Sequence, residues 1–378
     1  IRFLFLPEAN AREASVVKEL HVIPVKDLRE TAAIINGDAE VKYFEAAENE
    51  ARPVCSDAVD FADVKGQENV KRALEVAASG GHNCLMLGAP GCGKTMLAKR
   101  LPTILPSMTF EEALEVTKIH SIAGILPSGV SLVSTRPFRC PHHSISDTGL
   151  VGGGAIPRPG EISLAHFGVL FLDELPEFSK KALETLRQPL EDGVITISRV
   201  NASLTYPART TLICAANPCR CGYFLDQPGK CTCTPRQIQQ YFGRLSGPLL
   251  DRIDIHIEVT PVKYTELDSD KTVESSAAIR ERVERTRKIQ LERYRGMNIY
   301  SNSQLQPAMF SRFCRLDRKC RSILKDVFDR FGMSARAHSR ILKVARTIAD
   351  MDMSEEIRPI HLAEAIQYRS LDRKTQKM

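Results

Sequence analysis

The chain of 378 residues is 43% hydrophobic and 26% charged, which excludes a disordered or fibrous protein and allows more than one packed domain. Its 52 Lys and Arg residues against 46 Asp and Glu residues give a net charge of +6, which permits a polyanionic partner without requiring one. No run of about eighteen apolar residues and no secretion signal is present, so we expect a cytoplasmic protein without a membrane segment. In that compartment the eleven cysteines are expected to be thiols or metal ligands.

Residues 1–52 look like the end of a preceding domain and a linker. A short apolar strand is predicted at 3–6, and helices are predicted at 9–20 and 25–36, with Gly37 as the stop of the second one. Because the chain enters this strand almost at once, we expect it to be the C-terminal part of a longer protein.

A complete phosphate-binding loop follows a predicted helix at 70–78 and an apolar run at 84–87. Its glycines let backbone N–H groups wrap a polyphosphate, its lysine places charge on the β- and γ-phosphates, and its threonine can hold Mg²⁺. The alternative is a glycine-rich turn ahead of an amphipathic helix. We expect ATP and Mg²⁺ to bind at Gly88, Ala89, Pro90, Gly91, Cys92, Gly93, Lys94, Thr95 and Met96.

From residue 53 to residue 262, short β-rich runs alternate with helical patterns, which predicts an α/β core with a parallel sheet covered by helices. The apolar run 168–172 ends in Asp173 and Glu174, and ligands bind at the carboxyl edge of such a sheet. We therefore expect Asp173 to support the Mg²⁺ ion. Glu174 is expected to orient or deprotonate the attacking water.

Two further segments lie within this core. Residues 194–207 consist of two β-rich halves around 199–201, which predicts a hairpin with Arg199 at its tip. Residues 136–160 are rich in Gly and Pro. For the histidine pair in this segment, packing or turn polarity is favoured over metal binding, because no matched ligand pair lies nearby. The basic and histidine residues singled out here are Arg139, His142, His143 and Arg158.

A third apolar strand, 211–216, ends on Asn217. This amide can donate to the γ-phosphate or position the water, whereas the alternative is an asparagine that opens a turn before Pro218.

Two CxC pairs follow, separated by a loop that contains Gly and Pro. Four thiolates can close a tetrahedral site, and structural Zn²⁺ fits best because protein ligands would fill all four positions. CxC is tighter than the usual CxxC, and free surface thiols are the alternative. The cysteines concerned are Cys219, Cys221, Cys231 and Cys233.

Arginines near the end of the core and in the C-terminal part complete the candidate site. Arg252, in the segment 249–254, stands where ring ATPases carry the residue that reaches a neighbour's γ-phosphate; pairing with Asp251 or Asp254 is the alternative. A charged connecting helix is predicted at 274–294, within a connecting region at 263–300. A small helical domain is predicted at 301–378, and its Arg336 could touch the same phosphates.

This order of motifs resembles an AAA+ P-loop ATPase with a C-terminal helical lid, and its details are similar to the YifB/ComM-type magnesium-chelatase-like proteins. The segments that carry this narrower resemblance are FRCPHHS (138–144), LVGGG (150–154), PGEI (159–162) and FLDELPEF (171–178). The resemblance implies a Lon-protease-like or ribosomal-S5-like domain ahead of the chain. It also implies a homo-hexameric ring in which the 136–160 insert and the hairpin face the central pore.

Two functions follow from the resemblance. The first is a DNA motor that performs branch migration during natural transformation, with Arg199, Arg139 and Arg158 as candidate contacts to the phosphate backbone. The second is a magnesium-chelatase-like ATPase that remodels a protein partner. A ring that serves assembly alone is a third possibility. The cysteine cluster is unexpected for a chelatase ATPase subunit, which favours the first function.

Overall fold

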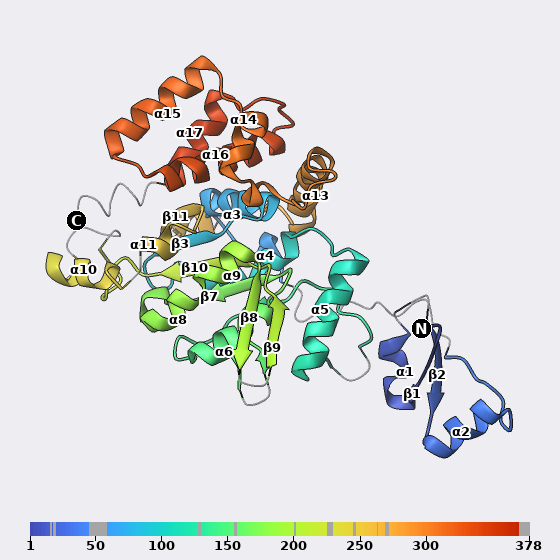
Figure 1. The fold of residues 1–378 in the computed structure, drawn as a ribbon. Helices are drawn as coiled ribbons and strands as arrows, with labels where there is room; N and C mark the ends of the chain where they lie inside the picture. Colours follow the sequence, from blue (N-terminus) through green and yellow to red (C-terminus); the bar gives the residue numbers. More distant parts are fainter. Residues whose placement is uncertain are drawn as a thin grey trace. The chain divides into compact units, whose positions relative to one another are not determined.

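The structure is a computed structural model, whose helices and strands are labelled in Figure 1. The chain divides into two compact units. The first unit comprises Ile1–Ser56 with Met108–Arg136, and the second comprises Asp57–Ser107 with Pro137–Met378. The structure describes residues 1–15, 17, 20–44, 59–127, 130–154, 157–199, 202–224, 230–244, 247–262, 264–268 and 272–369.

The first unit opens with two parallel strands, where the sequence predicted one strand and a long helix. Strand β1 (Phe3–Pro7) pairs with β2 (His21–Val25), and helix α1 (Glu8–Ala14) follows β1. The prediction of a helix over 9–20 is therefore wrong in its extent. The strand after it was missed, although its β-branched residues favour extended chain and Pro24 disfavours a helix.

Helix α2 (Leu28–Asn36) corresponds to the helix predicted at 25–36 but begins later. Asp27 caps its N-terminus by accepting two backbone hydrogen bonds, and Gly37 ends it with a left-handed φ of 82°. The same unit contains helix α5 (Phe110–Ala123), which starts with a capping box.

The second unit is built on a five-stranded parallel sheet with the strand order β11-β3-β10-β7-β4. The phosphate-loop strand therefore lies between two other strands, and one of them ends on Asn217. The strands are β3 (Cys84–Gly88), β4 (Phe138–Arg139), β7 (Val169–Leu172), β10 (Thr211–Ala216) and β11 (Ile255–Val259).

Both faces of this sheet are covered. On β3, Cys84 and Met86 pack into one hydrophobic core, whereas Leu85 and Leu87 pack into a second one. All five residues of this strand are buried, as expected for parallel strands that have helices on both faces. The predicted α/β fold of the AAA+ class, with its parallel sheet, is thus confirmed.

Helices of varied length surround the sheet. Helix α3 precedes the phosphate-loop strand and α4 follows the loop, as the sequence predicted. The described elements are η1 (Phe61–Asp63), α3 (Glu68–Gly80), α4 (Lys94–Ile104), α6 (Asp147–Val151), α7 (Glu161–Leu164), η2 (Leu175–Glu177), α8 (Lys180–Thr185), α9 (Arg187–Asp192), α10 (Pro235–Phe242), α11 (Gly247–Leu250) and α12 (Tyr264–Leu267).

Two short antiparallel pairs extend from the core. Strands β8 (Val194–Arg199) and β9 (Ala202–Pro207) form the hairpin that the sequence predicted, with Val194 opposite Pro207. Strands β5 (Gly152–Gly153) and β6 (Arg158–Pro159) pair within the 136–160 segment. The turn of the hairpin, residues 200–201, lies outside the described residues.

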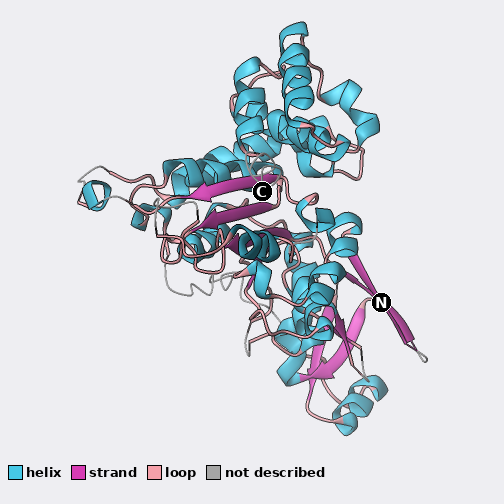
Figure 2. Cartoon of the chain, turned by 90° about the vertical axis from the view of Figure 1, so that its left-hand side faces the viewer, coloured by secondary structure: helices cyan, strands magenta, loops and turns pink. Residues whose placement is uncertain are grey.

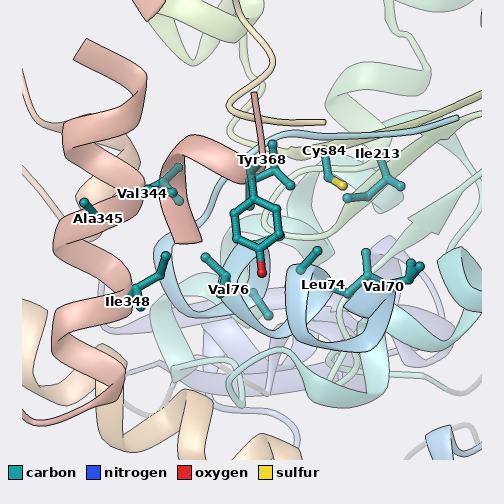
Figure 3. Close-up of a cluster of buried hydrophobic side chains, with 14 of the residues drawn as sticks. Val70, Leu74, Val76, Cys84, Ile213, Val344, Ala345, Ile348 and Tyr368 are labelled. Atoms are coloured by element: carbon teal, nitrogen blue, oxygen red, sulfur yellow. The ribbon is translucent and has the colours of Figure 1, made fainter. Parts of the chain in front are cut away.

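The C-terminal part is a helical lid, the all-helical group at the top of Figure 2. Helix α13 (Ser276–Arg293), labelled in Figure 1, joins it to the core and corresponds closely to the predicted connecting helix. Figure 3 shows Val344 and Ile348 of the lid near Val76 of α3 and near Tyr368. These side chains belong to one continuous hydrophobic core that also includes sheet residues. The lid elements are η3 (Asn302–Gln304), η4 (Pro307–Met309), α14 (Phe310–Phe313), α15 (Arg318–Phe331), α16 (Ala335–Met351) and α17 (Pro359–Gln367).

Candidate nucleotide site and cysteine cluster

The phosphate loop joins β3 to α4, and its lysine is the first residue of that helix. Gly91 and Gly93 have φ angles of 77° and 91°, a left-handed conformation that other residues rarely adopt. The Lys94 ammonium is buried and donates to the carbonyl oxygens of Gly88 at 2.7 Å and Ala89 at 2.9 Å. The cation is thus held at the loop.

The ends of β7 and β10 bring polar side chains to the same place. The Thr95 hydroxyl donates to Asp173 Oδ2 at 2.7 Å, and Lys94 Nζ donates to Asn217 Oδ1 at 3.1 Å. These contacts follow from the strand order, because β10 lies between β3 and β7 and all three are parallel. Four residues that the sequence analysis predicted for the nucleotide site therefore form two hydrogen-bonded pairs at the carboxyl edge of the sheet.

Glu174 stands apart from these pairs. Its side chain is 55% exposed, and its φ of 51° is left-handed, which is uncommon for a residue other than glycine. Its backbone N–H donates to Asp173 Oδ1 at 2.9 Å, but the two carboxylates have different side-chain partners, Thr95 for Asp173 and His143 for Glu174. Strained backbone of this kind is concentrated at functional sites.

His143 contacts Glu174, which the sequence did not predict. Its Nδ1 lies 3.3 Å from Glu174 Oε2, whereas the neighbouring His142 contacts the Ser144 hydroxyl at 2.8 Å. The signal available in the sequence was the pair of histidines shortly after a short strand. That strand, β4, was recognisable as a neighbour of β7 only once the sheet had formed.

The two arginines expected to contact the γ-phosphate, Arg252 on a neighbouring subunit and Arg336 from the lid, both form ion pairs within the chain. Arg252 is buried and forms an ion pair with Glu191 of α9, a partner outside the predicted pairings. Arg336 is exposed, and its Nη1 donates to Asp251 Oδ2 at 2.9 Å.

The three arginines proposed as DNA contacts differ in their exposure to solvent and in their ion pairing. Arg139 forms a two-pronged pair with Glu161, with distances of 2.6 and 2.7 Å. Arg158, in β6, is exposed. Arg199 is the last residue of β8, and the position of its side chain lies outside the description.

The four paired cysteines gather in one place. The ligand atoms of Cys219, Cys221, Cys231 and Cys233 all lie within 4.8 Å of one another. Cys219 Sγ is 3.2 Å from Cys221 Sγ and 3.8 Å from Cys231 Sγ. Sulfur atoms about 2.3 Å from a tetrahedral zinc are about 3.8 Å apart, so this donor set fits that metal. A hydrogen bond from the Tyr223 backbone lowers the pKa of Cys221 to about 6.

The other cysteines that the structure describes do not join this cluster. Cys140 is exposed, and Cys55 lies outside the described residues. The others are buried, as small apolar side chains commonly are: Cys84, Cys92, Cys214, Cys314 and Cys320.

Fold and site together define a P-loop core of the AAA+ class with a helical lid. Residues 60–267 match the family model described as magnesium chelatase, subunit ChlI, and residues 273–369 match the model of the ChlI C-terminal part. The chain therefore belongs to the magnesium-chelatase ChlI family, in its ComM/YifB-like branch.

Individual relatives agree with this assignment. Competence protein ComM of Haemophilus influenzae is 44% identical over 382 residues, which cover 100% of this chain and 73% of ComM. YifB of Escherichia coli is 44% identical over 369 residues, covering 93% of this chain and 71% of YifB. Rv2897c of Mycobacterium tuberculosis is 40% identical over 347 residues, covering 92% of this chain and 68% of Rv2897c.

Within the described part of the chain, no helix is both long enough and apolar enough to span a membrane.

Proposed function

We propose that this chain hydrolyses ATP with Mg²⁺. The observation that carries the proposal is the contact of Lys94 with Asn217 and of Thr95 with Asp173 at the mouth of a phosphate loop. Gly91 of the loop is exposed, and a Cβ added there would meet no atom within 4 Å. A cation, a hydroxyl and a carboxylate beside open backbone fit a magnesium nucleotide.

In the proposed reaction, Glu174 accepts a proton from the attacking water. A bond forms between the water oxygen and the γ-phosphorus while the bond to the β–γ bridging oxygen breaks, which yields ADP and inorganic phosphate. Lys94 and Asn217 hold the γ-phosphate in line, and Thr95 and Asp173 would hold Mg²⁺. The bound metal would neutralise charge on the phosphate oxygens.

We propose further that the working form is a homo-hexameric ring in which Arg252 acts on the neighbouring subunit's γ-phosphate. In this single chain Arg252 is paired with Glu191, and the exchange of that partner for a phosphate would couple ring assembly to hydrolysis. An arginine supplied in this way is worth roughly 10³ to 10⁵ in rate. Arg336 would contact the same phosphates from the lid.

We propose that this ATPase acts on DNA in the cytoplasm and remodels it by branch migration. The relative named competence protein supports a transformation-related role. Arg158 is exposed and Arg199 ends β8 next to the hairpin turn, so these two are the stronger candidates for phosphate contacts. Arg139 would have to leave Glu161 first.

The cysteine cluster is proposed to bind structural Zn²⁺ through Cys219, Cys221, Cys231 and Cys233. A metal assay of the purified protein tests this directly, with about one zinc per chain expected.

The alternative is that the chain acts as a magnesium-chelatase-like ATPase that remodels a protein partner. Steady-state ATPase rates should therefore be measured without DNA and with single-stranded, duplex and branched DNA. Stimulation by branched DNA supports the DNA motor, and indifference to all three supports a protein-directed ATPase. Absence of any ATP hydrolysis would contradict both.

The ring is tested by mixing two inactive variants. Arg252→Ala lacks the trans arginine and Lys94→Ala lacks the phosphate-loop cation, so mixed rings would contain some interfaces with both groups intact. We expect partial recovery of ATPase activity on mixing. Absence of recovery in rings that demonstrably contain both variants would contradict a trans role.

A further inference from the structure

The cysteine cluster begins at the nucleotide site itself. Strand β10 ends at Ala216, the next residue is Asn217, and Cys219 follows after one proline. Asn217 accepts the hydrogen bond from Lys94 Nζ at 3.1 Å, and Cys219 is completely buried. Anything that holds Cys219 therefore restricts the residue that contacts the phosphate-loop lysine.

The turn formed by residues 219–222, which contains the first cysteine pair, lies against the phosphate loop. Gly222 N–H donates to the Cys219 carbonyl at 3.0 Å, and Gly222 has a left-handed φ of 88°. A Cβ added at Gly222 would lie 2.4 Å from Pro90 Cδ and 2.7 Å from Pro90 Cγ. Only a glycine can approach Pro90 this closely, so the cysteine loop packs directly on the loop that wraps the phosphates.

The second cysteine pair, Cys231 and Cys233, precedes a helix that packs near the end of β10. Thr234 follows Cys233 and caps helix α10 through a capping box. On this helix, Phe242 packs against the hydrophobic core that also contains Cys214 and Ala216 of β10. The helix that starts at the cluster therefore shares a core with the end of β10.

We propose that the metal bound by the four cysteines supports the nucleotide site, and that its loss weakens nucleotide binding. This inference rests on the proposed binding of ATP and of zinc. Four sulfur atoms within 4.8 Å of one another hold the two ends of the loop together once a metal bridges them. Bridging therefore fixes Gly222 against Pro90 and Asn217 beside Lys94 before the nucleotide arrives.

Removal of the metal tests the proposal on the full chain. The affinity for a fluorescently labelled ADP is measured in Mg²⁺ buffer, with the zinc-loaded protein and after zinc removal and restoration of Mg²⁺. If the ordered loop is then populated about a tenth of the time, the Kd rises roughly ten-fold. The double variant Cys231→Ser/Cys233→Ser should lose zinc and show the same rise, whereas Cys320→Ala, which changes a buried cysteine outside the cluster, should do neither.

Gly222→Ala separates the packing from the metal. It should retain zinc but bind the labelled ADP more weakly, because its methyl group displaces Pro90. Gly296→Ala is the matched control: Gly296 has a similar φ of 80°, but its added Cβ meets no atom within 4 Å. Circular dichroism verifies that each variant is folded.

The possible failures point to different errors. A zinc-free wild type as purified, equal affinities with and without zinc, or equal affinities of Gly222→Ala and Gly296→Ala would each overturn the support role. A zinc-loaded wild type that binds no nucleotide would remove the proposed function as well.

Discussion

The phosphate-loop end of the sheet and the contact between the sheet and the lid both contain charged side chains, but these differ in burial and in pairing. At the lid, Asp254 is 2% exposed, and its two oxygens accept from Arg340 at 2.8 Å and contact His82 Nδ1 at 3.0 Å. At the phosphate-loop end, the Glu174 side chain is more than half exposed, and its Oε2 lies 3.3 Å from His143 Nδ1.

A second buried carboxylate extends the contrast. Asp350, in α16, accepts from Arg293, Arg346 and Asn302 through both of its oxygens. A buried charge that is fully paired contributes to stability chiefly because its loss leaves its partners uncompensated. A half-exposed carboxylate on strained backbone costs stability, and strained backbone of this kind is concentrated at functional sites. Substitutions in the two regions should therefore affect different measurements.

The largest effect is expected at Glu174. Glu174→Gln should lower kcat for ATP hydrolysis about 10²- to 10⁴-fold, because the amide cannot accept the proton of the attacking water. Binding of labelled ADP and the melting temperature should change little, since the side chain is exposed. Hydrolysis at the wild-type rate would show that Glu174 does not activate the water.

The next largest effect is expected at Asp254. Asp254→Asn should lower the free energy of unfolding by about 3 to 5 kcal/mol, because Arg340 and His82 lose their charged partner. Asp251→Asn, at an exposed pair with Arg336, should cost less than about 1 kcal/mol and serves as the control. Chemical denaturation at neutral pH measures both, and equal losses would contradict the distinction.

The lowered pKa of Asp254 predicts that the free energy of unfolding depends on pH. Burial alone would raise the pKa of Asp254, but Arg340 and His82 lower it below its ordinary value. As the pH falls, the unfolded chain takes up a proton on this carboxylate before the folded chain does, so stability present above about pH 5 decreases in acid. Denaturation midpoints between pH 3 and pH 6 should show this decrease in the wild type and a smaller one in Asp254→Asn.

A smaller effect is expected at His143. His143→Ala should lower kcat roughly five-fold, because Glu174 loses the contact that orients it, while the affinity for labelled ADP is retained. His142→Ala is the matched control, since His142 contacts Ser144. Equal kcat values for the two variants would make His143 a packing residue.

The smallest effect on stability is expected at Arg336. Arg336→Ala removes an exposed ion pair and should change the free energy of unfolding by less than about 1 kcal/mol. If the lid arginine contacts phosphates, ATP hydrolysis falls all the same. A loss of stability without any loss of hydrolysis would assign Arg336 to structure.

Where local pattern and spacing are strong, sequence alone was sufficient. The phosphate loop, the strand that ends in Asp173 and the hairpin at 194–207 each carry a local signal of glycine spacing or apolar run, and the structure contains all three elements. The strand β2 was missed, because five residues carry little periodic signal and the pairing with β1 decides their conformation.

What the sequence by itself determined is the set of chemical groups and their place at element ends: a lysine, a threonine, two carboxylates and an amide after loops and strands. Only the tertiary structure decided the pairings, such as Arg252 with Glu191, Arg139 with Glu161, and His143 with Glu174. The same holds for the packing of Gly222 on Pro90. The physical reason is that these contacts join residues far apart in the chain, which strand order and sheet register bring together after folding.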